Sequence, residues 1–83
     1  MELKRRIKLK DEKFGVVVFD TETEKVFVTN QVGKEIINKI KEGKSIDQII
    51  EELSNEYEGE KEQIRNDVYE FIDQLKKMDL LKE

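Results

Sequence analysis

Two short runs of β-branched and aromatic residues, separated by a polar turn, constrain the fold of this chain more than any other feature. The segment GVVVFDTETEKVFVTN covers residues 15–30 and predicts a β-hairpin with strands at residues 14–19 and 25–29. Both faces of the hairpin carry apolar side chains, which predicts that other parts of the protein pack against more than one side of it. Because a lone two-stranded hairpin is only marginally stable in water, the rest of the chain has to supply that cover.

The remaining sequence has the periodicity of three helices. The first follows Asn30, whose side chain suits an N-cap, and ends near Gly43, a residue type favoured just past a helix end. The second opens with the capping box of Ser45 and Gln48, and the third covers residues 60–78. The apolar residues that we expect in the core from these helices and the segment after them are Val32, Ile36, Ile37, Ile40, Ile46, Ile49, Ile50, Leu53, Tyr57, Ile64, Val68, Phe71, Leu75, Met78, Leu80 and Leu81.

The first 13 residues are basic and have partial apolar alternation at Leu3, Ile7 and Leu9. This segment predicts either a short first strand or a solvated N-terminal arm. With strands first and helices after them, the sequence predicts a single domain over residues 1–83. Its fold class is α+β and winged helix-turn-helix-like, with a small antiparallel N-terminal β-sheet of two to three strands followed by three α-helices.

The composition excludes most catalytic chemistry. The chain contains no Cys and no His. It therefore lacks a thiol nucleophile, a thiolate metal site and the commonest general base. The acidic run at residues 47–60 and the alternating acids at residues 20–24 are better explained as a solvated helix face and a polar hairpin turn. We therefore expect a protein that is not an enzyme and that needs no cofactor and no metal.

Charge and hydropathy narrow the location and the partner. No apolar run reaches the roughly 20 residues of a membrane span, so we expect no membrane association and a cytoplasmic location. Enrichment in Lys, Glu and Ile suggests a bacterial source. The net charge of -4 argues against nucleic acid as the main partner. A small winged-helix DNA-binding transcriptional regulator stays as the alternative, because the basic arm at residues 4–13 could contact a phosphate backbone.

Two features instead indicate a peptide partner. The predicted strand at residues 25–29 carries one Lys and no Pro, so its free edge is weakly guarded and could accept a further strand. The third helix also has a second stripe, which suits the wall of a groove for an amphipathic, partly acidic segment. The ordinary alternative places Ile72 in the core and Tyr69 at its periphery. The stripe consists of Lys61, Arg65, Tyr69, Ile72 and Lys76.

The segments VFVTNQVGKEIINKIKEGKSIDQIIEELSNEY and IRNDVYEFIDQLKKMDLL resemble PqqD-like proteins, the recognition elements for ribosomally synthesised and modified peptides (RiPPs). The resemblance covers residues 16–81. Three positions depart from the family pattern. Gly33 stands where the family usually has a small Ala, Thr29 where it often has a Leu, and Asp79 where it commonly has a Gly. The matching motifs, in chain order, are Asn30 after the hairpin, Glu42-Gly43, Ser45 with Ile49, Leu53 with Tyr57, and Asp67-Val68 with Phe71.

The resemblance implies a non-catalytic module that binds the leader segment of a precursor peptide by β-strand addition, in the groove between the last strand and the third helix. The module would present the core of the precursor to a separate modifying enzyme, such as a radical SAM maturase. Without a leader, both a monomer and an edge-paired homodimer stay open. The leader-binding residues carried over from the family are Lys25, Val26, Phe27, Val28, Thr29, Arg65, Val68, Tyr69 and Ile72.

Overall fold

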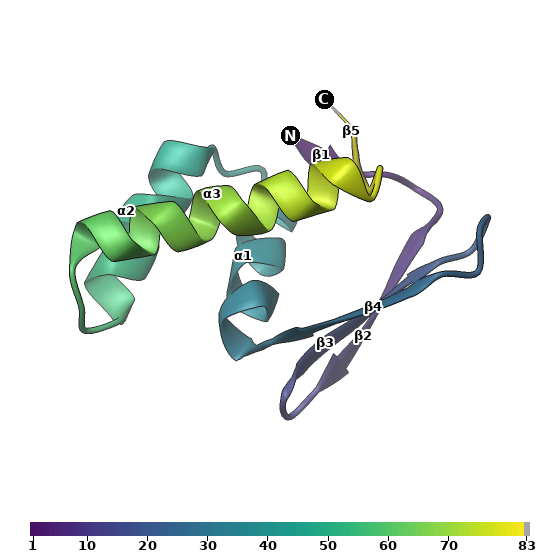
Figure 1. Ribbon diagram of the computed structural model, residues 1–83, viewed down its shortest axis with the longest axis horizontal. Helices are drawn as coiled ribbons and strands as arrows, with labels where there is room; N and C mark the ends of the chain where they lie inside the picture. Colours follow the sequence, from purple (N-terminus) through teal and green to yellow (C-terminus); the bar gives the residue numbers. More distant parts are fainter. Residues whose placement is uncertain (83) are drawn as a thin grey trace.

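A small antiparallel sheet lies beside three helices in the computed structural model, which describes residues 1–82 (Figure 1). This arrangement confirms the predicted α+β, winged helix-turn-helix-like fold. Within the described residues, no helix is long and apolar enough to cross a membrane. The elements are β1 (Glu2–Leu3), β2 (Ile7–Glu12), β3 (Gly15–Asp20), β4 (Val26–Asn30), α1 (Gln31–Lys41), α2 (Ile46–Glu56), α3 (Lys61–Lys77) and β5 (Leu81–Lys82).

The main sheet has three strands in the order β2-β3-β4, so β3 is central and β2 and β4 are its edges. The basic N-terminal segment therefore contains a strand, and the alternative of a solvated arm is wrong. Side chains on the inner face, among them Val16 and Val18, are buried under the helices. On the outer face Val26 and Val28 are 58% and 56% exposed, so the prediction of cover on both faces is wrong.

A second, two-stranded sheet joins the two ends of the described chain. β1 pairs with β5 in antiparallel fashion, with Leu3 opposite Leu81. The sequence pattern did not predict this sheet, because strands of two residues carry too little periodicity to be recognised. Its formation confirms that Leu80 and Leu81 return to the core, where both are buried.

Capping groups confirm the predicted starts of the first two helices, whereas α3 starts without a side-chain cap. The side chain of Asn30 accepts a hydrogen bond from the amide of Gly33 at 3.0 Å, and Ser45 forms the reciprocal capping box with Gln48. Gly43 ends α1 with a positive φ of 84°. Three residues expected in the core are instead partly exposed at the surface, namely Val32, Tyr57 and Met78.

Candidate functional site

The free edge of β4 carries unused backbone hydrogen-bonding groups. The amide of Asp20 donates to the carbonyl of Lys25 at 2.9 Å, which fixes the hydrogen-bonded position nearest the turn. Such positions alternate along antiparallel strands, so the backbone groups of Val26, Val28 and Asn30 point away from β3. Among the described strands none pairs with this edge, which is therefore open to a further strand.

Side chains of β4 alternate between the helices and the outer face of the sheet. Phe27 points toward α3, and its ring centroid lies 6.2 Å from that of Phe71. Thr29 also points inward and is buried, whereas Val26 and Val28 face outward. The two partly buried Phe rings therefore join the edge strand to the third helix.

Three adjoining hollows follow α3 and together form what we call the trough. The hollow at the C-terminal end of α3, of about 420 Å³, shares Lys77 with the middle hollow and reaches Lys25 and Phe27 of the hairpin. The hollow at the N-terminal end, of about 210 Å³, shares Asp67 with the middle one and is lined from all three helices. The middle hollow, of about 460 Å³, is lined by Asp67, Glu70, Phe71, Asp73, Gln74 and Lys77.

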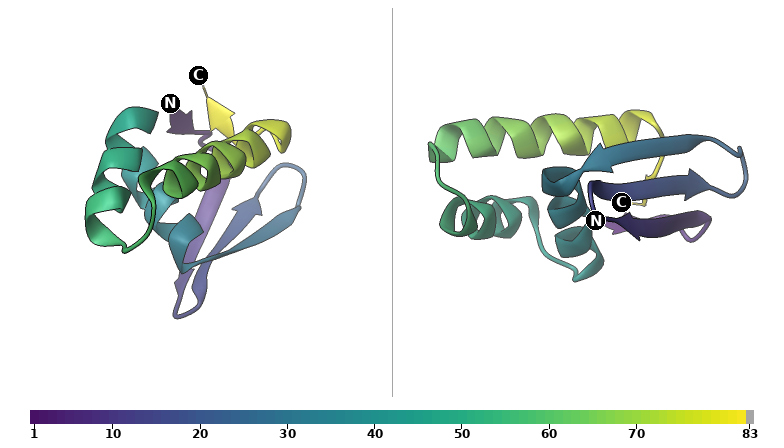
Figure 2. Two further views of the ribbon diagram at one scale, coloured as in Figure 1. Left: turned by 60° about the vertical axis from the view of Figure 1, so that its left-hand side comes forward. Right: turned by 90° about the horizontal axis from the view of Figure 1, so that it is seen from below.

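The open edge of β4 runs along this trough. Of the three strands in the main sheet, β4 lies nearest to α3, and the two elements run in opposite chain directions (Figure 2, right). Lys25, just before β4, lines the hollow at the end of α3, while Val32, just after β4, lines the hollow at its start. An extended peptide paired with β4 would therefore lie within the trough along its length.

The charges of the trough are unevenly distributed. Asp67, Glu70 and Asp73 line its middle, and Lys25 and Lys77 lie at the end formed by the hairpin turn. Within residues 1–82 none of these five groups forms an ion pair. Carboxylates on the exposed face of α3 would repel a phosphate backbone, so the DNA-binding alternative finds no support here.

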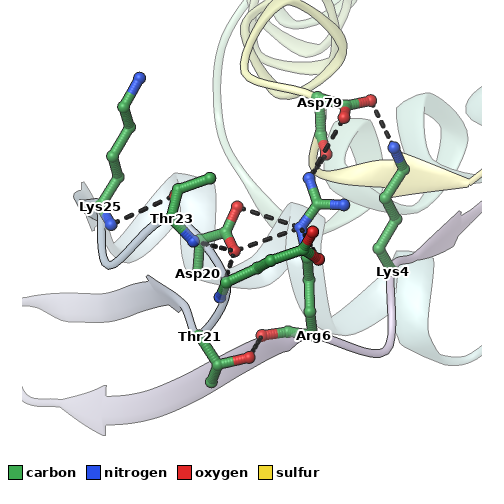
Figure 3. A network of polar contacts seen from close by, with 8 residues as sticks. Lys4, Arg6, Asp20, Thr21, Thr23, Lys25 and Asp79 are labelled. Carbon is green, nitrogen blue, oxygen red and sulfur yellow. Dashed lines mark hydrogen bonds and ion pairs between the residues drawn. The ribbon is translucent and has the colours of Figure 1, made fainter.

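A network around Arg6 fixes the end of the trough near the hairpin turn (Figure 3). Arg6 Nε donates to both carboxylate oxygens of Asp20, each at 3.1 Å. Its Nη2 donates to the carbonyl of Asp79 at 2.8 Å and to the Asp79 carboxylate at 3.2 Å. Lys4 forms an ion pair with the same carboxylate. One guanidinium therefore connects the segment before β2, the hairpin and the end of α3.

Two acidic residues of this network have specific structural roles. The carboxylate of Asp20 accepts hydrogen bonds from the amides of Glu22 and Thr23, which confirms that residues 20–24 form a polar hairpin turn. Asp79 has a φ of 60°, the left-handed conformation that a Gly would supply just past a helix end. Its contacts with Lys4 and Arg6 account for an Asp at this position.

Hydrogen bonding lowers the pKa of both carboxyl groups. Burial by itself raises the pKa of Asp20, but the amides of Glu22 and Thr23 and the Arg6 guanidinium outweigh burial, so the pKa lies below its ordinary value of 3.8. Lys4, followed by Arg6, lowers the pKa of Asp79. A carboxylate with a lowered pKa stabilises the folded protein at pH values above the ordinary pKa of the group. This stabilisation is lost as the pH falls through the lowered pKa.

Asp20→Asn is therefore expected to lower the urea midpoint of unfolding near neutral pH. The difference from the wild type should shrink as the pH falls from about 4 through the lowered pKa of Asp20, because the wild-type carboxylate then loses its charge as well. Circular dichroism during urea titration at both pH values measures this effect. Asp73→Asn is the matched control, since Asp73 is exposed and has no ion pair within residues 1–82. An equal difference at both pH values would contradict a role for the Asp20 charge.

The structure brings the predicted strand residues together at the trough. Lys25 and Phe27 line the trough with their side chains, and Val26 and Val28 direct their backbone groups to its open edge. Thr29 is different, because its backbone pairs with β3 and its side chain is buried. Four of the five strand residues thus have a group that a bound peptide could reach.

The predicted helix residues are placed differently. Val68 lines the hollow at the N-terminal end of α3 and is fully buried, and Ile72 is in the core. Arg65 packs its guanidinium 5.4 Å from the ring centroid of Tyr69. Tyr69 lines a separate hollow beside the start of α2, together with Lys76. Of the four, the trough therefore includes only Val68.

The flank of α3 that lines the trough is the other side of the core stripe from Arg65 and Tyr69. Val68 and Leu75 are fully buried and mark the centre of the stripe. Asp67, Phe71 and Gln74 lie on one side of that centre and line the trough. The motif Asp67-Val68 with Phe71 was the available signal, but the helical period alone does not tell which flank faces β4.

Two of the departures from the family pattern accommodate each other. A Cβ atom on Gly33 would lie 1.7 Å from Oγ1 of Thr29 and 2.9 Å from the ring of Phe71. A threonine at the end of β4 therefore requires a glycine in the first turn of α1. The pair lets α1 approach both β4 and the Phe71 side of the trough.

Comparisons with known proteins agree with this architecture. The structure of TbiB1 in complex with the TbiA(beta) leader peptide aligns with a TM-score of 0.91 at 23% identity, covering 99% of this chain and 95% of that one. A lasso peptide synthetase B1 complexed with the leader peptide aligns with a TM-score of 0.89 at 21% identity, covering 99% and 96%. No curated protein gives a significant match. The family described as coenzyme PQQ synthesis protein D (PqqD) matches residues 15–81, so the chain belongs to the PqqD family.

Proposed function

We propose that this protein is a non-catalytic recognition module that binds the leader segment of a ribosomally made precursor peptide. The leader adds as a strand to the open edge of β4 and fills the trough beside α3. The observation that carries the proposal is that the edge of β4, where the backbone groups of Val26 and Val28 are unpaired, lies beside α3, with Phe27 of β4 against Phe71 of the helix. Membership of the PqqD family supports it, as do two structures of the same fold that were obtained with leader peptides.

The contacts of the proposed complex follow from the trough. Backbone hydrogen bonds to Val26 and Val28 supply affinity, while Phe27 and Phe71 receive apolar side chains of the leader. The carboxylates of the middle hollow, which form no ion pair within residues 1–82, favour a leader with a cationic residue rather than an acidic one. Arg65 and Tyr69, which the sequence analysis assigned to the wall, lie outside this proposed contact surface.

The proposed role is to hold the precursor for a separate modifying enzyme, such as a radical SAM maturase. A module that binds both the leader and the enzyme raises the effective concentration of the core peptide at the active site. The absence of Cys and His from the chain supports assigning the chemistry to that partner. In the absence of a leader, the same edge could pair two copies of the chain.

An NMR titration tests the proposal. We expect a synthetic leader of the precursor encoded beside the gene to shift the amide signals of residues 26–30. Signals of Phe71 and Gln74 should also shift more than those of Arg65 and Tyr69, because the former two line the trough. Shifts confined to residues 45–60, with none along β4, would contradict strand addition.

A further inference from the structure

The hollow at the start of α3 has features that strand addition alone does not use. It is lined by apolar side chains from three helices, including Val32 of α1, Leu53 of α2 and Ile64 of α3. Tyr57, just after α2, closes one side. Both Val32 and Tyr57 are 39% exposed although their spacing predicted core positions. We call this hollow the end pocket.

The size of the end pocket limits what can occupy it. Its volume of about 210 Å³ is below the range of about 300–1,000 Å³ typical of small-molecule sites. Its walls are apolar at the back, where Leu53 and Val68 are buried, and polar at the rim. These dimensions suit one large apolar side chain better than a free ligand.

The end pocket is continuous with the trough. Asp67 lines both the pocket and the middle hollow. β4 ends at Asn30, and Val32, two residues later, forms part of the pocket wall. A peptide strand paired with β4 therefore arrives at the mouth of the pocket as it extends past Asn30.

We propose that the end pocket is an anchor site that takes one large apolar side chain of the bound leader. The side chain comes from the part of the leader that extends beyond the position opposite Asn30. This inference rests on the proposed function and adds a determinant of leader specificity to it. The backbone edge accepts many sequences, whereas the pocket selects leaders with a leucine-sized or aromatic residue at one position.

Tyr57→Ala tests the anchor site. We expect it to weaken binding of the synthetic leader of the precursor encoded beside the gene by about tenfold, as loss of one well-packed apolar contact would. Binding is measured by fluorescence anisotropy. Phe14→Ala is the matched control, because Phe14 is an exposed aromatic residue in the β2–β3 turn and lines none of the three hollows. It should bind like the wild type.

A scan of the same leader with alanine identifies the anchor residue. Leaders with alanine at the anchor should bind the wild type about tenfold more weakly, and Tyr57→Ala should weaken them no further. Val32→Trp, which narrows the pocket from α1, should weaken the natural leader to a similar extent. The anchor site would be overturned if Tyr57→Ala and Val32→Trp both bound the leader like the wild type. It would also be overturned if the loss caused by Tyr57→Ala added to the loss caused by alanine at every position of the leader.

The outcomes separate the anchor site from strand addition. If the leader shifts the amide signals of residues 26–30 but not those around Val32 and Ile64, the proposed function stands and the anchor site is excluded. If the leader shifts neither group, the proposed function itself fails. With Tyr57→Ala, we expect the shifts along β4 to persist at saturating leader.

Discussion

Val28→Pro is expected to weaken leader binding by more than about tenfold while leaving the fold intact. Val28 lies at the centre of the open edge of β4, opposite Val17, and its N–H points away from the sheet. Proline removes that donor, and its ring occupies the space that the added strand must approach. Edge positions with an outward N–H are where a sheet tolerates proline, because no bond of the existing ladder is lost.

The size of the effect follows from the lost contacts. One backbone hydrogen bond contributes about 0.5–1.5 kcal/mol, which corresponds to a loss of affinity of up to about tenfold. Steric exclusion of the strand adds to this loss, so binding should fall by more than about tenfold. Fluorescence anisotropy with the labelled leader measures the affinity, and thermal unfolding by circular dichroism checks the fold.

Phe27→Pro is the informative counterpart on the neighbouring residue. The N–H of Phe27 faces β3, opposite Val18, so proline there breaks the ladder and should destabilise the protein itself. Proline at Val28 should reduce leader affinity, whereas proline at Phe27 should reduce stability. This difference between neighbouring residues is expected only if the leader pairs with the free edge of β4. If Val28→Pro binds the leader like the wild type, the leader does not add to β4.

The sequence predicted the strand beside the trough better than the flank of α3 that lines it. The β-branched run at residues 26–29, with no proline, indicated both the strand and its unguarded edge, because period-two alternation and strand chemistry are local properties. The two ends of the chain were harder. β1 and β5 are paired across nearly the whole sequence and consist of two residues each, so no local pattern marks them.

The helix wall depended on information that a periodic pattern does not contain. Phe71 and Ile72 are both apolar and lie on opposite sides of the centre of the core stripe, so the sequence allows either flank of α3 to face β4. Which flank faces β4 is set by how α3 packs against the rest of the fold, through contacts such as Phe27 with Phe71. Exposure of Tyr57 was unpredicted for a related reason, because the helical stripe of α2 ends at Glu56 and Tyr57 already has an extended backbone.

Gly15→Ala is expected to destabilise the fold strongly, because the added methyl group would collide with backbone atoms. Gly15 is opposite Asn30 at one end of the β3–β4 pairing. A Cβ there would lie 1.9 Å from the carbonyl oxygen of Thr29 and 2.6 Å from the carbonyl carbon of Asn30. Both are backbone atoms, so no side-chain rotation relieves the collision.

Two costs add at this position. The φ of 157° is one that side chains rarely adopt, at a cost of about 1–3 kcal/mol, and overpacking costs about 1–3 kcal/mol more. A domain of this size has a total stability of about 4–12 kcal/mol, so Gly15→Ala should be partly unfolded or have a much lower urea midpoint. It should also displace the end of β4 beside the end pocket.

Gly43→Ala separates the collision from backbone strain. Gly43 also has a positive φ, 84°, but a Cβ there would meet nothing within 4 Å. We therefore expect a loss of only about 1–2 kcal/mol, from the left-handed conformation alone. Urea unfolding of the two variants measures the difference. If Gly15→Ala is no less stable than Gly43→Ala, then β3 and β4 can move apart at Asn30 without cost, and the end of β4 is less firmly fixed than its close backbone contact implies.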